Sequence, residues 1–168
     1  ALDSIGSFYF TKEVFDGTYP GYGSSYPDLQ GALALLFEQA SSRGHLQKTA
    51  FGEITFPFTI RNQYVSGMTT VKAAVENKAY LRKYQQDFFK SALGNASKSR
   101  IKGYSFKDDY DKNRVKAFID KLLLHQVDVY KNNDSYVVPT NQPQYRMVQS
   151  FFETYDKYRD SVYYDASA

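Results

Sequence analysis

The sequence predicts an α/β fold, and two patterns carry that prediction. The first is an unbroken apolar run, residues 32–37, which is bounded by turn-forming residues and leads directly into Glu38. A run of this length suits a β-strand covered on both faces, although Ala and Leu favour helix and periodicity alone does not decide between them. The second is an alternation of strand and helix patterns after residue 100, which is typical of a parallel α/β unit.

The first 31 residues contain few signals of regular structure. Residues 7–11 form a short aromatic segment that predicts a strand. The loop at residues 17–31 is too rich in glycine and proline for a helix or a strand, and long loops of this kind are usually functional or disordered. Tyr19 and Tyr22 lie in this loop, where they either pack the loop or contact a ligand.

Three further elements are predicted before residue 103. Residues 45–56 predict a hairpin around a central turn. The longest helix is expected to be capped by Thr69 or Thr70 and to stop at Gly94, with its charged face in solvent. Residues 94–102 are small and polar, and we interpret them as a domain boundary.

Beyond this boundary strands and helices alternate. The predicted elements are a strand at 101–106, a helix capped by Asp111, strands at 127–130 and 136–139, and a helix with Asn141 as its cap and Pro143 in its first turn. His125 follows the first of these helices, where the helix dipole favours a cation, and a metal-binding role is the weaker alternative.

The composition excludes several classes of function. A net charge of +3 without a basic run argues against a nucleic-acid partner, and no apolar stretch approaches the roughly 20 residues of a membrane span. The chain has no cysteine, so disulfides and thiol chemistry are excluded. It has 16 Tyr and 13 Phe; core packing is the favoured explanation, and a binding surface for sugars or peptides is the alternative.

One stretch, YPGYGSSYPDLQGALALLFEQASSRG at residues 19–44, carries a family resemblance. It is similar to the C-terminal part of the catalytic domain of zinc carboxypeptidases, specifically the large secreted bacterial branch. Similarity continues at residues 55–63, 136–146 and 163–168. In that family a strand ends in the glutamate that acts as general base, and a Gly/Ser/Tyr-rich loop before it borders the substrate pocket.

The resemblance implies a division of the chain. Residues 1–94 would form the C-terminal portion of a mixed-sheet zinc-carboxypeptidase fold, and residues 95–102 would be a linker. An α/β domain of the class I glutamine amidotransferase-like type can follow the peptidase in this family. Residues 103–168 would then begin such a parallel α/β accessory domain.

The resemblance also assigns site residues. Glu38 matches the catalytic glutamate, although a surface glutamate at the end of an element is the ordinary alternative. Tyr22, with Tyr19 second, matches the tyrosine that closes over the substrate. Arg43 has the fork geometry to contact a substrate carboxylate, but a surface role is the stronger interpretation.

The zinc ligands of the family are missing from this chain. They are a His-x-x-Glu pair and a later His, all upstream of the glutamate strand. Only His45 and His125 are present, both downstream of Glu38 and neither in such a pair. Because a catalytic zinc site needs three protein ligands, we expect zinc in the full-length parent and no metal in this part of it.

Three hypotheses follow from these observations. The first is the C-terminal portion of a secreted or periplasmic zinc metallopeptidase, a hydrolase that acts in proteolysis and is not active as this piece alone. Its partners would be the upstream part of the same polypeptide and a peptide substrate, through either a C-terminal residue or a cell-wall peptide. The second is a non-catalytic, tyrosine-rich module that binds glycans or peptides. The third is a structural piece whose parent has lost activity.

Overall fold

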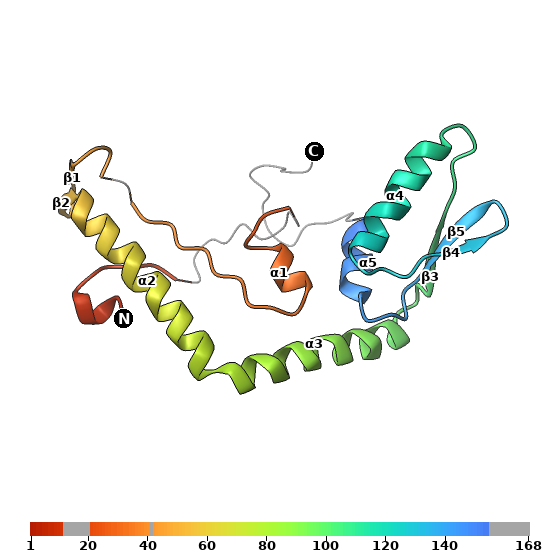
Figure 1. Cartoon of the computed structure of the whole chain (residues 1–168), viewed down its shortest axis with the longest axis horizontal. Coiled ribbons are helices and arrows are strands. Elements are labelled where there is room, and N and C mark those ends of the chain that lie inside the picture. The colour runs from red at the N-terminus through yellow and green to blue at the C-terminus, as the bar shows by residue number, and fades with distance from the viewer. Residues whose placement is uncertain (12–20, 41, 155–168) are drawn as a thin grey trace.

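Two long helices and a small mixed unit at their far end dominate the fold (Figure 1). The computed structural model describes residues 1–11, 21–40 and 42–154. Helices α2 and α3 meet at an angle and form an open V, with the β1–β2 hairpin at one end and the strands and helices of residues 103–152 at the other. Helices and small antiparallel sheets are both present, which is compatible with the general α/β class.

The amino-terminal part is mostly irregular. Its described residues, 1–11 and 21–31, contain the 3-10 turn η1 (Asp3–Ile5) and the short helix α1 (Tyr26–Leu29). The strand expected at residues 7–11 does not form, and Phe8 and Phe10 are 93% and 87% exposed. A strand needs a neighbour to pair its backbone groups, and no described strand lies beside this segment.

The predicted hairpin is confirmed. Strands β1 (Leu46–Thr49) and β2 (Gly52–Thr55) are antiparallel, with Leu46 opposite Thr55. The side-chain oxygen of Thr49 accepts the N–H of Phe51 at 3.2 Å, which stabilises the turn between the strands.

The prediction for the longest helix is wrong at both ends. Helix α2 (Phe56–Glu76) begins directly after β2, where Thr55 Oγ1 accepts the N–H of Phe58 at 3.3 Å and a proline occupies the first turn. Helix α3 (Lys78–Lys98) continues through Gly94. Asn77 separates the two helices with φ −103° and ψ 19°, and its side-chain amide donates to Ala73 O at 2.8 Å. This local hydrogen bond competes with the helix and favours a break.

The expected linker is therefore partly helical. Residues 95–98 form the last turn of α3, and only residues 99–102 connect it to the first strand of the far unit. The division into domains stays a prediction. No helix among the described residues is both long and apolar enough to cross a lipid bilayer.

Residues 103–152 fold into a three-stranded sheet with two helices. The elements are β3 (Gly103–Phe106), α4 (Lys112–Leu124), β4 (Tyr130–Asn132), β5 (Ser135–Pro139) and α5 (Tyr145–Phe152). The strand order is β3-β5-β4 and both pairings are antiparallel, so the predicted parallel unit is wrong. For β4 and β5 the reason is a two-residue turn between Asn132 and Ser135, in which Asn133 has φ 51°. Such a turn makes an antiparallel hairpin, whereas parallel strands need a long crossover.

The structure confirms some of the local signals in this unit and contradicts others. Asp111 caps α4, because its Oδ1 accepts the N–H of Arg114 at 2.9 Å. The strand expected at 127–130 starts only at Tyr130, since Val127 is 1% exposed and bends back to bond Leu122 O through its N–H. The Asn141 cap is also wrong: α5 starts after Gln144, which makes no side-chain cap bond.

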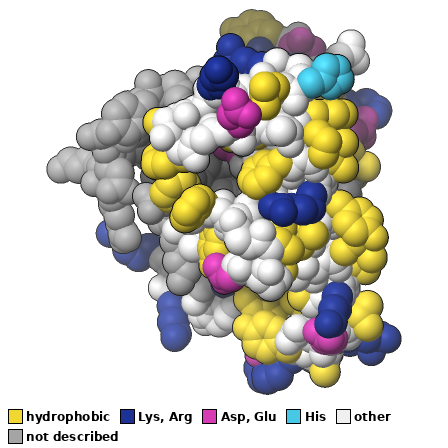
Figure 2. Space-filling view, turned by 90° about the vertical axis from the view of Figure 1, so that its left-hand side faces the viewer, with side chains coloured by type: hydrophobic (Ala, Val, Ile, Leu, Met, Phe, Trp, Pro, Cys, Tyr) yellow, Lys and Arg dark blue, Asp and Glu magenta, His cyan; other side chains and the backbone are white. Residues whose placement is uncertain are grey.

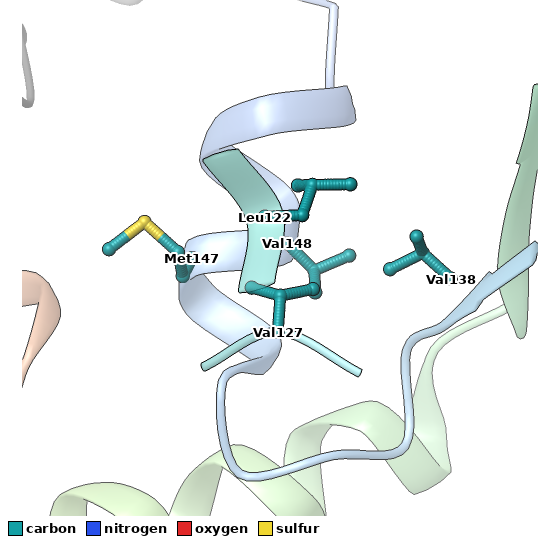
Figure 3. Close-up of a cluster of buried hydrophobic side chains, with 5 residues drawn as sticks. All are labelled: Leu122, Val127, Val138, Met147 and Val148. Atoms are coloured by element: carbon teal, nitrogen blue, oxygen red, sulfur yellow. The ribbon is translucent and has the colours of Figure 1, made fainter. Parts of the chain in front are cut away.

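The core lies in this unit (Figure 3). Side chains from α4, the turn after it, β5 and α5 converge there and are almost fully buried: Leu122, Val127, Val138, Met147 and Val148. Aromatic rings surround this cluster, among them Tyr104 stacked on Phe152 with ring centroids 4.8 Å apart. In residues 103–152 core packing thus accounts for much of the aromatic content.

Candidate functional site

The apolar run before Glu38 is not the buried strand that the sequence predicts. Residues 32–40 have no regular secondary structure, and Leu35 and Leu36 are 61% and 50% exposed. Near its start the run is tied to α1, because Ala32 N–H donates to Pro27 O at 3.0 Å and Ala34 N–H to Asp28 Oδ1 at 2.9 Å. No described strand pairs with it. Without a neighbouring strand, the sequence signal for a covered strand cannot be realised.

The run nevertheless has two distinct sides. Alternate residues Leu33, Leu35 and Phe37 line a groove of about 540 Å³ together with residues of α2 and α3. An alternation of two is the period of an extended chain, in which successive side chains point to opposite sides. Glu38 follows Phe37 and therefore belongs to the side that faces away from the helices.

Glu38 is next to a residue that is fixed to α2. The side-chain amide of Asn62, which is 4% exposed, donates to Gln39 Oε1 at 3.1 Å and to Ser7 Oγ at 2.8 Å. Through these two hydrogen bonds the buried amide joins the segments that contain Ser7 and Gln39 to α2. The sequence reasoning missed Asn62, because a single asparagine in a helical pattern carries no signal of its tertiary partners.

The Glu38 side chain itself is exposed. It makes no hydrogen bond or ion pair with any residue that the structure describes. Within that same part of the chain, no group of three or more His, Cys, Asp and Glu residues is placed to hold a metal ion. A zinc ion beside Glu38 would therefore need ligands from outside the described residues.

The other candidate residues lie apart from Glu38 in the fold. Tyr19 lies outside the described residues. Tyr22 accepts the N–H groups of Ser25 and Tyr26 at 3.0 Å each, and it lines a second groove, of about 610 Å³, with Lys121, His125 and Phe151 among other residues. Tyr22 is thus placed against the far unit and not in the groove of the apolar run.

Arg43 lies in the turn that leads into β1. Its φ is 43° and that of Gly44 is 101°, and the Ser42 hydroxyl donates to Gly44 O at 2.7 Å. The side chain of Arg43 is exposed at this turn. Four residues, 39–42, of which residue 41 is not described, separate it from Glu38 along the chain.

The two histidines occupy different parts of the fold. His45 packs edge-on against Phe56, with ring centroids 6.1 Å apart, whereas His125 follows α4 and its Nδ1 is 3.0 Å from the hydroxyl of Tyr26. Each contact is with an aromatic side chain, which supports a structural role over a metal ligand for both.

Helix α2 carries a stripe of exposed apolar side chains. They recur every three or four residues along one side of the helix and are 47% to 71% exposed: Phe56, Ile60, Tyr64, Met68, Val71 and Val75. This spacing is the signature of a helix face that packs on another element. Figure 2 shows hydrophobic side chains gathered among charged ones at this end of the molecule. None of the six lines the groove of the apolar run.

Comparison of the chain with protein-family models, with curated proteins and with solved structures found no match.

Proposed function

We propose that this chain is the C-terminal portion of a zinc-dependent carboxypeptidase-type metallopeptidase in which Glu38 is the general base. The observation that carries the proposal is the setting of Glu38: its carboxylate is exposed on the open side of an extended run, while the adjacent Gln39 is held to α2 by buried Asn62. A general base must be both accessible to its substrate and held in place.

Glu38 would take a proton from the attacking water and later deliver it to the leaving amine. General bases of this kind contribute about 10²- to 10⁴-fold in rate, and their geometry matters first. In the family that the sequence resembles, zinc lowers the pKa of the water to about 7. The described residues do not supply a ligand set for that ion. The proposal therefore assigns the zinc ligands to the upstream part of the polypeptide.

The apolar surfaces near Glu38 support a partner of this kind. The stripe on α2 and the outer side of the apolar run, with Leu36 half exposed, are surfaces that soluble domains normally cover. The upstream part of the same polypeptide would pack on both and bring its metal ligands beside Glu38. The substrate would be a peptide, and a periplasmic or secreted location follows from the same resemblance.

The tyrosine-rich binding module is the weaker alternative. A binding face would gather its exposed tyrosines, but of those in the described residues, which are Tyr9, Tyr64, Tyr80, Tyr110 and Tyr130, only Tyr9 and Tyr80 line the groove of the apolar run. They belong to the amino-terminal segment, α2, α3, the loop before α4, and β4. We therefore place the peptidase proposal first.

The decisive experiment uses the full reading frame around this segment, with bound zinc quantified and peptidase activity measured on peptides with a free C-terminal residue. Glu38→Gln should lower kcat by two to four orders of magnitude with zinc retained. Glu53→Gln, in β2, is the matched control, since it changes another exposed carboxylate in the same way and should keep full activity. Unchanged activity in Glu38→Gln, or a parent protein without zinc, would overturn the proposal.

A further inference from the structure

The short helix α1 is docked on the far unit. Tyr26 and Leu29 pack against the buried cluster formed by α4, β5 and α5. The Tyr26 hydroxyl lies 3.0 Å from Nδ1 of His125, and the two rings have centroids 5.4 Å apart. One residue of the glycine-rich loop thus makes both an apolar and a polar contact with a residue 99 positions away.

A second polar contact lies one helical turn further on. Gln144 Nε2 donates to Gln30 Oε1 at 3.2 Å, and Gln144 is only 5% exposed. Breaking this bond would leave a buried amide N–H without a partner, which costs free energy. The bond therefore stabilises the interface more than an equivalent bond in solvent would. We call the two contacts, Tyr26–His125 and Gln30–Gln144, the polar bridge.

Helix α3 closes the same interface from the other side. Gly31 lies against Phe88, and the guanidinium of Arg146 lies 4.2 Å from the centroid of the Phe88 ring. Arg146 also donates to Phe88 O at 2.7 Å and to Ser91 Oγ at 3.0 Å. Because α5 supplies Arg146 and α3 supplies Phe88, the end of the loop is held between two elements that are themselves joined.

We infer that the unit of residues 103–152 positions the glycine-rich loop of residues 21–31 through the polar bridge, and so shapes the groove of about 610 Å³ that Tyr22 lines. His125 and Gln144 are then positioning residues that touch no reacting atom. The inference rests on the proposed function only for its effect on substrate. The mechanical part, that the bridge orders the loop, stands on the contacts alone.

Two different parts of the fold hold the candidate site residues in place. The loop with Tyr22 is held by the far unit, whereas Glu38 is fastened to α2 through Gln39 and Asn62. Where the proposed substrate extends into the groove lined by Tyr22, loss of the bridge should therefore loosen its contacts there and leave Glu38 in place. In kinetic terms KM rises and kcat is retained.

The test uses the full-length protein and hydrogen exchange of the amides of Ser25, Tyr26, Ala32 and Ala34, all of which are bonded within this segment. Tyr26→Phe keeps the packed ring and removes the hydroxyl. His125→Leu removes its partner. Each change should speed exchange of these amides about two- to tenfold, which is the factor that corresponds to the net free energy of one hydrogen bond. The double variant should be no faster than the single ones.

Two controls sharpen the test. Tyr110→Phe makes the same chemical change at a fully exposed tyrosine and should leave loop exchange as in the wild type. His125→Gln offers a side-chain oxygen to the Tyr26 hydroxyl and should restore part of the protection lost in His125→Leu. Loop exchange that is unchanged in both Tyr26→Phe and His125→Leu would overturn the inference.

The peptidase assay then tests the functional consequence on the same variants. We expect KM to rise several-fold in Tyr26→Phe and His125→Leu with kcat within about twofold of the wild type. Faster exchange with unchanged KM would overturn the link between the groove lined by Tyr22 and the substrate. A wild-type protein with no peptidase activity would refute the proposed function instead, and the exchange data would still decide whether the bridge orders the loop.

Discussion

Replacement of Gly31 by alanine should destabilise the protein through both backbone strain and overpacking. The φ of Gly31 is +71°, in the left-handed region, and a Cβ built on it would lie 3.0 Å from Cδ1 and 3.1 Å from Cγ of Phe88. The left-handed conformation costs a non-glycine residue about 1–2 kcal/mol. Overpacking adds about 1–3 kcal/mol, because Arg146 covers the Phe88 ring and hinders its retreat. Gly31→Ala should therefore lower the free energy of unfolding by about 2–5 kcal/mol.

Gly94→Ala is the matched control for that change. Gly94 lies within α3 and an added Cβ would meet nothing within 4 Å, so alanine should stabilise the helix by about 0.5–1 kcal/mol. Both variants can be compared by urea denaturation monitored by circular dichroism. A Gly31→Ala protein within 0.5 kcal/mol of the wild type would refute the reasoning. Destabilisation by Gly94→Ala would instead place a helix stop at Gly94.

Two further predictions concern the far unit. Leu122→Ala should cost about 2–5 kcal/mol because this side chain is fully buried, whereas Leu124→Ala, at a side chain 70% exposed, should stay within about 0.5 kcal/mol in the same denaturation assay. The hydrogen bond from Arg114, followed by those from two backbone N–H groups, lowers the pKa of Asp108 to about 2. Because the folded-state pKa is depressed, the stabilisation that it represents is complete above the ordinary value of 3.8 and is lost as the pH falls through about 2. Carbon NMR titration should show this midpoint, and Arg114→Leu should move it back toward 3.8; a wild-type midpoint already near 3.8 would contradict the assignment.

Features that depend on a few neighbouring residues could be predicted from the sequence. The hairpin at 45–56, the Asp111 cap and the strand at 136–139 all rest on local turn, cap or alternation signals, and the structure contains them. The start of α2 also had a local signal, Thr55 with a proline two residues later, but the apolar spacing further along the helix drew the prediction to Thr69 or Thr70.

Features that depend on distant partners could not be predicted in this way. The run at residues 32–37 has the composition of a covered strand, yet its state is decided by whether another strand is beside it. The antiparallel direction of β4 and β5 depends on a tight turn at Asn133, which an alternation of strands and helices does not reveal. The same holds for the site. Glu38 and Tyr22 could be named from a resemblance, but Asn62 and Gln144 act through partners far away in sequence.

The polar bridge also bears on the order in which the chain folds. Its two contacts close intervals of 99 and 114 residues, whereas α2 and α3 need only local contacts and the strands of the far unit lie within 37 residues of one another. Contacts between distant residues carry the larger loop-closure entropy and slow folding. The long helices and the far unit should therefore form first, and docking of α1 should be a late step. A stopped-flow experiment would then find that Tyr26→Phe speeds unfolding and leaves the folding rate nearly unchanged.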